Sequence, residues 1–569
     1  MKFSYAQAGL LLAAASAAAK EMAKDEVRGR ELYDTGIIHE RNKARKVAGW
    51  LAEADAGLLD SSVHPRLNYT KCIDGVVSAV PGNPLYTFKC KNIDLYDFIN
   101  HATLGSPHGW DEKGDGVLLT GSSSWGWTDP ESDREFVASG MYDGTAFLEI
   151  LPEGRFVHLG FLPVPVATNT NALWKEIRAY KNYMLIGSEL GGHGIQIFDM
   201  TKLLTITAAQ APVVFDPVKD VTSTFKGLPQ GATHNVVVNE ELGYAVAVGA
   251  RPRNGPCRAG LIFIDLKDPS KPTSPGCNGQ DGYVHDAQCL VYRGPDTRYQ
   301  GKDICYGYNE DTLTIYDVTD KANSKIVSIT SYEGATYTHQ GWVLDPNWQE
   351  YLVMDDEIDE IDGNGPAADR YPVTYIWDIR DLEKPKQTGL YKGTVPAVDH
   401  NQYIYNGMLY QSNYMAGYRV YDVSSIPQDP TGDSVCEIAY LDIYPEDDAA
   451  PGGGIADMFG TWSSYAMFKS GYIFINTIER GAYLAKMTKR EKCPVKHVCN
   501  ADNCLRALRS TSVKGRLEES QEFCEGFTAS VTADVGVVPT YAAKACGANI
   551  ISRVSSACSC LPTATPTAA

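Results

Sequence analysis

The chain has 569 residues, of which 44% are hydrophobic and 21% charged, so it is long enough for a repeat architecture or for several domains. Its formal net charge of −19 and sequence pI of about 5.1 argue against nucleic acid or an anionic membrane surface as a partner. Its 33 tyrosines and 52 glycines suit many short strands joined by turns.

The first 19 residues have the pattern of a secretory signal peptide. Lys2 supplies a positive start, residues 8–15 are apolar, and the small residues at 15–17 match a cleavage site. The apolar run is too short to span a bilayer, and no later segment approaches about 20 apolar residues. We therefore expect a secreted protein, extracellular or associated with a cell wall, that has no transmembrane segment.

Residues 20–89 form a charged lead-in to the rest of the chain. Apolar positions recur at roughly helical spacing between about residues 20 and 60, which predicts one or two helices. Cys72 and Cys90 follow, and we expect them to form a local disulfide. The sequon NYT predicts a glycan on Asn68, because such sequons are glycosylated in secreted chains.

From residue 90 to 487 the chain repeats a short apolar strand that ends in an acid. The acids are Glu149, Asp199, Asp265, Asp317, Asp378 and Asp422, and a seventh copy carries Lys486 instead. The copies lie 44 to 66 residues apart, which is typical of one four-stranded propeller blade per repeat. Helical repeats of similar period are excluded, because these segments are rich in Tyr, Val, Ile and Gly.

A second marker lies upstream of each strand in the same phase. It consists of Trp127, Trp174, His234, His285, His339, His400 and Trp462. A residue just before the first strand of a blade points toward the central channel, so these side chains are expected to converge at one mouth. Both signals give seven copies. The sequence therefore predicts an all-β, seven-bladed β-propeller with an N-terminal helical lead-in and a small disulfide-rich C-terminal module.

That module spans residues 493–560, before a disordered Pro/Thr/Ala tail at 561–569. Its cysteines are Cys493, Cys499, Cys504, Cys524, Cys546, Cys558 and Cys560. Because seven is an odd number, one cysteine of the module is left to pair outside it. Cys436 in the propeller is its natural partner, and Cys493 is the cysteine that we expect to pair with it. Cys257 with Cys277 and Cys289 with Cys305 are plausible local pairs. The remaining connectivity cannot be deduced from spacing.

Several stretches in residues 90–487 resemble a known family. They include WGWTDPESDREF, GGHGIQIFD, DGYVHDAQC followed by YRGPD, YTHQGW, VDHNQY and NYMAGYRVYDV. They look like the secreted choice-of-anchor B proteins, which carry LVIVD-type propeller repeats and have no established activity. The pattern CNADNCLRALRS through SSACSCL is similar to a cysteine-rich module of secreted fungal proteins. This resemblance implies a secreted fungal glycoprotein, and it departs from bacterial members that end in anchoring signals.

The four histidines of consecutive repeats are the strongest candidate site. His234, His285, His339 and His400 could bind Zn²⁺, Cu²⁺ or Mn²⁺ where they converge, with Asp286 and Asp399 as ligands or as acceptors that orient the rings. The alternative is that each histidine donates to the backbone of a neighbouring blade and closes the propeller. His193 lies at a different place in its repeat and is not expected to join.

Two further sets of residues suggest binding. Acids in the segment MDDEIDEIDGNG suit Ca²⁺, which takes six to eight oxygen ligands, although a solvated loop explains them as well. The five candidate ligands are Asp355, Asp356, Glu357, Asp359 and Asp362. An aromatic set could stack on sugar rings at a channel mouth, or it could only pack the blades. It comprises Trp125, Trp127, Trp342, Trp348, Tyr337, Tyr403 and Tyr414.

Three functions remain open at this stage. The favoured one is a non-catalytic extracellular propeller that binds a protein or a carbohydrate through its channel mouth. The second is a metal-dependent hydrolase or oxidoreductase that uses the histidine cluster. The third is a structural wall or matrix protein whose C-terminal module makes the contacts. No nucleophile elbow, phosphate-binding loop or dinucleotide fingerprint is present to decide among them.

Overall fold

The computed structural model describes residues 21–105, 120–495, 503–510, 512–528, 534–547, 550–558 and 560–561. The predicted signal peptide, Cys499 and almost all of the predicted tail lie outside these ranges. The chain divides into two compact units, Met1–Cys493 and Pro494–Ala569. In the described ranges, no helix is long and apolar enough to cross a membrane.

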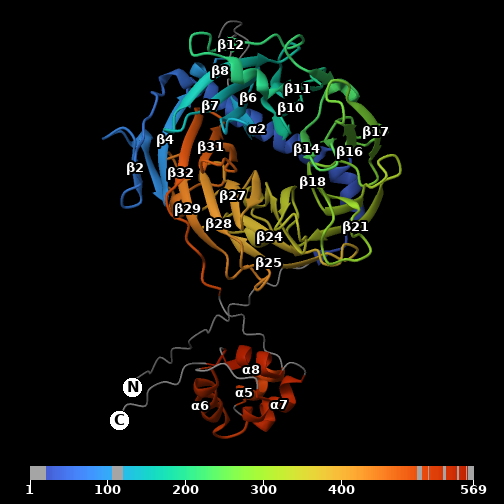
Figure 1. Cartoon of the computed structure of the whole chain (residues 1–569), viewed down its shortest axis with the longest axis vertical. Coiled ribbons are helices and arrows are strands. Elements are labelled where there is room, and N and C mark those ends of the chain that lie inside the picture. The colour runs from blue at the N-terminus through green and yellow to red at the C-terminus, as the bar shows by residue number, and fades with distance from the viewer. Residues whose placement is uncertain are drawn as a thin grey trace, which may run out of the picture. The chain divides into compact units, whose positions relative to one another are not determined.

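The predicted propeller is confirmed: the described strands form seven sheets arranged as a ring (Figure 1). The strands of each sheet are given from the inside of the ring outward. The first sheet is β5 (Gly121–Thr128), β6 (Glu135–Met141), β7 (Gly144–Ile150), β8 (Phe156–Pro163) and β12 (Val213–Val214). The second is β9 (Lys175–Tyr180), β10 (Tyr183–Ser188), β11 (Ile195–Asp199) and β13 (Ser223–Phe225), and the third is β14 (Asn235–Asn239), β15 (Tyr244–Val248), β16 (Leu261–Asp265) and β17 (Thr273–Asn278).

The fourth sheet is β18 (Asp286–Val291), β19 (Asp303–Tyr308), β20 (Leu313–Asp317), β21 (Lys325–Tyr332) and β1 (Glu21–Met22). The fifth is β22 (Thr338–Val343), β23 (Tyr351–Asp356), β24 (Val373–Asp378) and β25 (Lys386–Lys392). The sixth is β26 (Gln402–Tyr405), β27 (Met408–Ser412), β28 (Tyr418–Asp422), β29 (Cys436–Asp442), β3 (Thr87–Lys91) and β2 (Val76–Ser78). The seventh is β30 (Thr461–Tyr465), β31 (Tyr472–Thr477), β32 (Gly481–Met487) and β4 (Ile93–Asn100).

The ring is closed by strands from opposite ends of the propeller sequence. β4 pairs antiparallel with β32, with Ile93 opposite Met487 and Asn100 opposite Gly481. A strand from the start of the repeat region thus becomes the fourth strand of the last sheet, which ties the two ends of the propeller sequence together. The seventh copy of the repeat, which carries Lys486, is the strand at this junction.

The repeated acid has a local structural reason in five of the blades. Its carboxylate accepts a hydrogen bond from the backbone N–H two residues later: Asp199 accepts from Thr201 N (3.0 Å), and Asp265 accepts from Lys267 N (2.8 Å). Asp317, Asp378 and Asp422 do the same with Thr319, Arg380 and Ser424. Such a turn ends the third strand of a blade and redirects the chain toward the fourth.

The core lies between neighbouring blades. One cluster, for example, joins the second and third blades through Leu185, Ile197, Val236, Ala245 and Ile262, all of them buried. Alternating side chains of each strand face the blade on either side, so that most of the ring is apolar packing between sheets.

The lead-in folds back onto the propeller. Short turns of helix, α1 (Glu26–Arg28) and a π-type turn at Gly29–Tyr33, precede the long helix α2 (Ile37–Asp55). α2 ends in a glycine-containing cap: Gly57 has φ +74°, and the N–H of Leu58 donates to Glu53 O at 2.9 Å. Figure 1 shows the blue ribbon of α2 running across the central opening of the ring. Two further short helices are α3 (His101–Leu104) and α4 (Asp359–Asp362).

The three expected local disulfides and the expected bond between Cys436 and Cys493 are present. They join Cys72 to Cys90, Cys257 to Cys277, Cys289 to Cys305 and Cys436 to Cys493. The C-terminal unit is a small helical module of α5 (Asn503–Leu508), α6 (Arg516–Thr528), α7 (Thr540–Cys546) and α8 (Ile550–Cys558). Disulfides Cys504–Cys546 and Cys524–Cys558 connect its helices, and Cys560 is also disulfide-bonded. A module with so small a core needs such links to be stable.

Candidate functional site

The inner strands of the blades all run in one direction along the channel, so their first and last residues lie at opposite mouths. Residues that precede or begin these strands are His234, His285, His339 and His400, and we call this end the histidine mouth. Residues near the strand ends include Trp125, Trp127 and Trp342, and we call that end the tryptophan mouth. Trp127 was expected at the histidine mouth, but it lies near the end of β5 and stacks on Phe136.

The four histidines form a continuous arc, as the sequence predicts. Successive ring centroids are 4.2, 4.3 and 4.7 Å apart in the order His234, His285, His339, His400. His285 Nδ1 donates to the carbonyl of His339 at 3.0 Å, and His400 Nδ1 donates to that of Trp462 at 2.8 Å. The bonds between blades that were the alternative to a metal site are therefore present for these two histidines.

Helix α2 covers the histidine mouth with one face. His39, Lys43, Lys46 and Trp50 are spaced i, i+4, i+7 and i+11, so they share that face. His39 Nδ1 lies 2.7 Å from Tyr337 OH, and Trp50 Nε1 donates to Met458 O at 3.1 Å. A cavity of about 20 Å³ remains between α2 and the arc, enough for roughly one water molecule.

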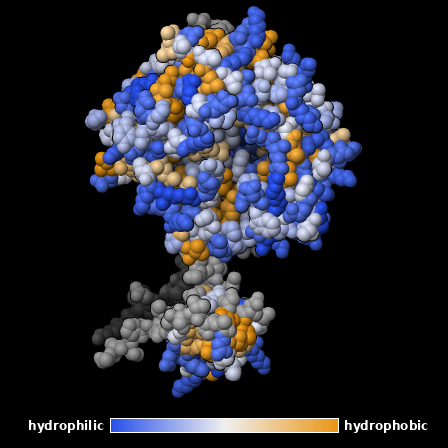
Figure 2. Space-filling model, in the orientation of Figure 1, coloured by the Kyte–Doolittle hydropathy of each residue, from blue (hydrophilic) through white to orange (hydrophobic). Residues whose placement is uncertain are grey.

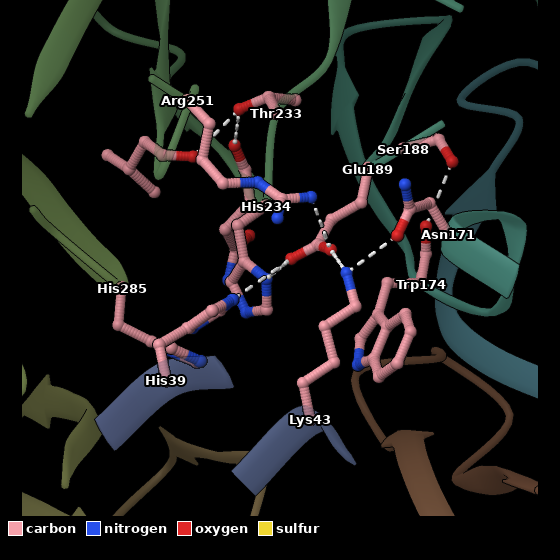
Figure 3. Close-up of polar contacts among 12 residues, drawn as sticks. His39, Lys43, Asn171, Trp174, Ser188, Glu189, Thr233, His234, Arg251 and His285 are labelled. Atoms are coloured by element: carbon pink, nitrogen blue, oxygen red, sulfur yellow. Dashed lines mark hydrogen bonds and ion pairs between the residues drawn. The ribbon is translucent and has the colours of Figure 1, made fainter. Parts of the chain in front are cut away.

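Glu189, which directly follows β10, is the anchor for one end of this face (Figure 3). Its carboxylate accepts hydrogen bonds from His234 Nδ1 at 2.7 Å, from Arg251 at 3.2 Å and from Lys43. Lys43 also donates to Asn171 at 2.8 Å. Burial opposes ionisation of Glu189, but the bond from His234 and the charge of Lys43 hold its pKa well below the usual range.

Glu357, which directly follows β23, is the anchor for the other end. Its Oε1 accepts hydrogen bonds from Lys46 Nζ and from Tyr414 OH, both at 2.5 Å, and lies 3.4 Å from His400 Nε2. Burial again opposes ionisation, but the charge of Lys46 and its hydrogen bond hold the pKa of Glu357 well below its ordinary value. The two carboxylates and the two lysines thus form matched, buried ion pairs between α2 and the propeller.

Three histidines of the arc, His285, His339 and His400, are uncharged at neutral pH. Burial is the main cause: it lowers the pKa of His285 and His400 well below the ordinary value of 6.5, and it lowers the pKa of His339 as well. Lys46 adds to this effect for all three, and neighbouring histidines add to it for His285 and His400, while Glu357 opposes it for His339 and His400. Neutral imidazole is the form that binds metal ions.

The metal set predicted from the sequence is only partly assembled. In the described part of the chain, the group with ligand atoms close enough for one ion is His339, Glu357 and His400, whose three atoms lie within 4.8 Å of one another. His234 is engaged with Glu189 instead. Asp286 accepts a hydrogen bond from Gln340 at 2.6 Å, and Asp399 faces Gln411 at 3.5 Å, so these two acids do not join the group.

The calcium set predicted from the acids is not formed, because their oxygens face different partners. Asp355 accepts from Gln340 N, Asp356 from Thr336 N and Tyr337 N, and Asp359 from Tyr375 OH. Glu357 faces the channel, and Asp362 pairs with Arg41 on α2 at 2.9 Å. The expected solvated loop is also wrong: all of these acids except Asp362 are buried. Burial, followed by their mutual repulsion, raises the pKa of Asp359 well above its usual value.

The tryptophan mouth opens into a cavity of about 750 Å³. Its lining includes Trp125, Trp127, Trp342 and Tyr465, together with Arg178, Lys181, Lys469 and Glu240. The Arg178 guanidinium lies 4.5 Å from the centre of the Trp125 ring. Figure 2 shows the face of the ring hollowed at its centre, with hydrophobic residues inside the hollow.

Three of the seven predicted aromatic residues therefore line one cavity, and the other four lie elsewhere. Tyr403 is buried beside Trp125, with ring centroids 6.0 Å apart. Tyr337 and Tyr414 lie at the histidine mouth under α2. Trp348 is 48% exposed and is not part of either mouth. Asn68, the predicted glycosylation site, is exposed, and its glycan stays a prediction.

Sequence reasoning missed Lys43, Lys46 and Glu189, which close the histidine mouth, and it named Glu357 only as a candidate ligand of Ca²⁺. The helical stripe from His39 to Trp50 was a usable signal, since an amphipathic face that carries two lysines and a tryptophan requires an acidic, aromatic partner. For Glu189 and Glu357 the signal was their position, one residue after the second strand of a blade.

Two buried histidines outside the arc make the fold sensitive to acid. Burial lowers the pKa of both His101 and His193 from 6.5 to about 4. His64 near His101 and Lys175 near His193 lower these values further, while backbone carbonyls partly oppose the shift. Because the unfolded chain binds protons between pH 6.5 and 4 and the folded chain does not, stability should fall as the pH drops through this window.

We expect each of these histidines to cost about 3 kcal/mol of unfolding free energy when the pH is taken from 7 to below 4. His193→Asn keeps a donor for Gly194 O, which the His193 ring contacts at 2.9 Å, but cannot be protonated. Urea unfolding between pH 7 and 4 should therefore show a shallower pH dependence for this variant. An identical slope in variant and wild type would contradict the assignment.

No family model matches the chain, and no curated protein sequence matches it. Among solved structures it is similar to a computationally designed protein, with 10% identity and a TM-score of 0.37, over 74% of this chain and 96% of that one. It is also similar to a functionally unknown protein from Desulfotomaculum acetoxidans, with 8% identity and a TM-score of 0.38, over 60% and 88% of the two chains. These values assign neither a family nor a function, and the resemblance to choice-of-anchor B proteins stays a prediction.

Proposed function

We propose that this protein is an extracellular binding propeller and that its tryptophan mouth takes a carbohydrate. The observation that carries the proposal is the cavity of about 750 Å³ lined by Trp125, Trp127 and Trp342. Its volume is typical of a small-molecule site, and such sites combine apolar walls with a few polar groups. The six disulfides that join described residues support an oxidising, extracellular compartment.

The two mouths differ in access, which favours the tryptophan mouth. At the histidine mouth, α2 fills the entrance and leaves about 20 Å³. At the tryptophan mouth, flat aromatic rings border an open cavity with hydrogen-bonding side chains beside them, including Gln288 and Asn182. A sugar ring is complementary to this lining. Its apolar face of C–H groups can pack on the aromatic rings, and its hydroxyls can form hydrogen bonds with the polar side chains.

The charges of the lining refine the class of sugar. Of the cations in the lining, Arg178 pairs with Glu176 and Lys469 pairs with Asp133. The remaining lining charges are one lysine and one acid, so the charges of this mouth largely balance and do not select for anions. We therefore infer that neutral oligosaccharides bind at least as tightly as those with carboxylate groups, such as uronic acids.

The test is titration calorimetry of the full chain with neutral and uronic-acid oligosaccharides. We expect the neutral sugars to bind at least as tightly as the acidic ones and to depend little on salt, because the lining has no excess charge for salt to screen. Trp342→Ala should weaken binding at least tenfold, about 1.4 kcal/mol, because it removes one aromatic wall. Trp348→Ala is the matched control, since this side chain is 48% exposed and outside the cavity.

Two outcomes would count against the proposal. If the wild type binds neither class of sugar, a carbohydrate is excluded as the ligand. Equal losses in Trp342→Ala and Trp348→Ala would place the binding surface outside the tryptophan mouth, and the exposed loops would then be the place to look for a protein partner.

A further inference from the structure

The environment of Glu357 is built for a cation held by more than one residue. His339 and His400 each offer a ring nitrogen, and these atoms and a Glu357 oxygen lie within 4.8 Å of one another. All three side chains are buried: His339 belongs to β22, Glu357 directly follows β23, and His400 lies two residues before β26. Two imidazoles and a carboxylate are a usual ligand set for Zn²⁺ and related transition metals.

The orientation of His400 makes this environment specific. A carbonyl oxygen only accepts hydrogen bonds, so the hydrogen on His400 lies at Nδ1, which faces Trp462 O at 2.8 Å. In the neutral ring, Nε2 then carries a lone pair, and it points at Glu357 Oε1 from 3.4 Å. Two lone pairs facing each other need a cation between or beside them. A backbone carbonyl on the far nitrogen is also how metal-binding histidines are usually oriented.

Buried polar atoms next to this group lack partners, which is an independent observation. Among the described residues, His339 Nδ1 and Asp355 Oδ2 have no hydrogen-bond partner, although both side chains are almost fully buried. The two side chains lie beside each other, with 3.4 Å between His339 Nδ1 and Asp355 Oδ1. Unsatisfied polar atoms at such depth are costly, and a bound ion that reorients the His339 ring would satisfy them.

The cation that is present is the ammonium of Lys46. Its Nζ lies 2.5 Å from Glu357 Oε1 and is 5.6 Å from the centre of the Trp462 ring, which also borders His400. Lys46 belongs to α2, an element outside the ring of blades. The positive charge at this position is therefore supplied by a side chain that moves away if α2 moves.

We propose that His339, Glu357 and His400 form a binding site for a divalent transition metal, and that Lys46 of α2 occupies it as a built-in competing cation. Three protein ligands leave at least one coordination position open, so the metal would remain accessible to a further ligand once α2 has withdrawn. This site is at the mouth opposite to the proposed carbohydrate cavity, and it goes beyond the function proposed above. Either can fail without the other.

The test compares Lys46→Met with the wild type as full chains, after treatment with a chelator and its removal. Co²⁺ is the probe, because its visible absorption reports coordination by nitrogen and oxygen ligands, and Zn²⁺ is titrated by calorimetry. We expect Lys46→Met to bind one ion per chain at least 100-fold more tightly than the wild type, and its thermal stability to rise when metal is added.

Lys43→Met is the matched control on the same face of α2. Arg251 and His234 still pair with Glu189 in that variant, so no vacant cation position is created. It should bind Co²⁺ no better than the wild type. Adding His339→Ala and His400→Ala to Lys46→Met should abolish the absorption.

The proposal is overturned if folded Lys46→Met binds no Co²⁺, or if binding survives the loss of both histidines. If Lys46→Met does not fold, Lys46→Gln serves the same comparison, since an amide can still donate to Glu357. The wild type gives a second measurement: metal must displace Lys46, so hydrogen exchange of the α2 amides should accelerate as Zn²⁺ is raised. Unchanged exchange with metal bound would also overturn the proposal.

Discussion

In a Glu357→Gln variant, α2 should be held on the propeller less tightly by about 3–5 kcal/mol, because the substitution leaves the Lys46 ammonium buried without its counter-charge. The side chain of Lys46 is only 8% exposed, so water cannot replace the lost carboxylate. Hydrogen exchange of the α2 amides measures this directly, since it reports local opening without unfolding the ring. Exchange should become roughly 100-fold to several thousand-fold faster.

Two further variants isolate the cause of this effect. Glu40→Gln removes a different ion pair of α2, the one with Arg251 at 3.2 Å, but Glu40 is 60% exposed, so the cost should be below about 1 kcal/mol. In the double variant Lys46→Met, Glu357→Gln, no charge is left unpaired, and much of the lost protection should return. Equal exchange rates in Glu357→Gln and Glu40→Gln would show that the buried pair does not hold α2.

The blade count could be predicted because each repeat carries its own local signal. An aspartate that bonds the N–H two residues later ends the third strand in five blades, and this turn chemistry depends only on nearby residues. The second marker was less reliable. Trp127 was aligned with the histidines by its residue type, but it lies at the far end of its strand, where it borders the other mouth.

The closed histidine mouth could not be predicted, because it depends on where a separate element packs. Nothing in the repeats indicates that α2 crosses the channel, and the ion pairs of Lys43 and Lys46 link residues 146 and 311 positions apart. The histidines were placed correctly in an arc, since their common position in successive blades determines this. Which of them share a carboxylate was decided by Glu189 and Glu357, which lie outside the repeated marker.

The acids of the segment MDDEIDEIDGNG show that a polar stretch of sequence is not necessarily exposed to solvent in the folded protein. Asp356 is fully buried, yet it accepts hydrogen bonds from Tyr332 OH and from the N–H groups of Thr336 and Tyr337. Burial raises the pKa of neighbouring Asp355, so part of the cluster is held in its neutral form. A group of acids can be accommodated inside a protein when backbone donors and protonation remove the charge problem, and the sequence carries no mark of either.

Trp50→Ala is expected to release the C-terminal half of α2, again at a cost of about 3–5 kcal/mol. The Trp50 ring is 1% exposed and lies between Trp174 and Trp462, with centroids 5.8 and 6.0 Å away. Alanine would leave a cavity among aromatic rings that cannot close in, and Met458 O would lose the Nε1 donor at 3.1 Å. Exchange of the amides in the second half of α2 should rise at least 100-fold.

Two variants separate aromatic packing from the hydrogen bond and from helix propensity. Trp50→Phe keeps most of the ring contact and should cost only about 1–2 kcal/mol, the value of one buried hydrogen bond. Leu51→Ala changes the next residue, which is 40% exposed, and should leave exchange almost unchanged because alanine favours helix. Protection of α2 that survives Trp50→Ala would mean that the ion pairs of Lys43 and Lys46 hold the helix alone. The histidine mouth would then be closed by charge, and a competing metal ion would be enough to open it.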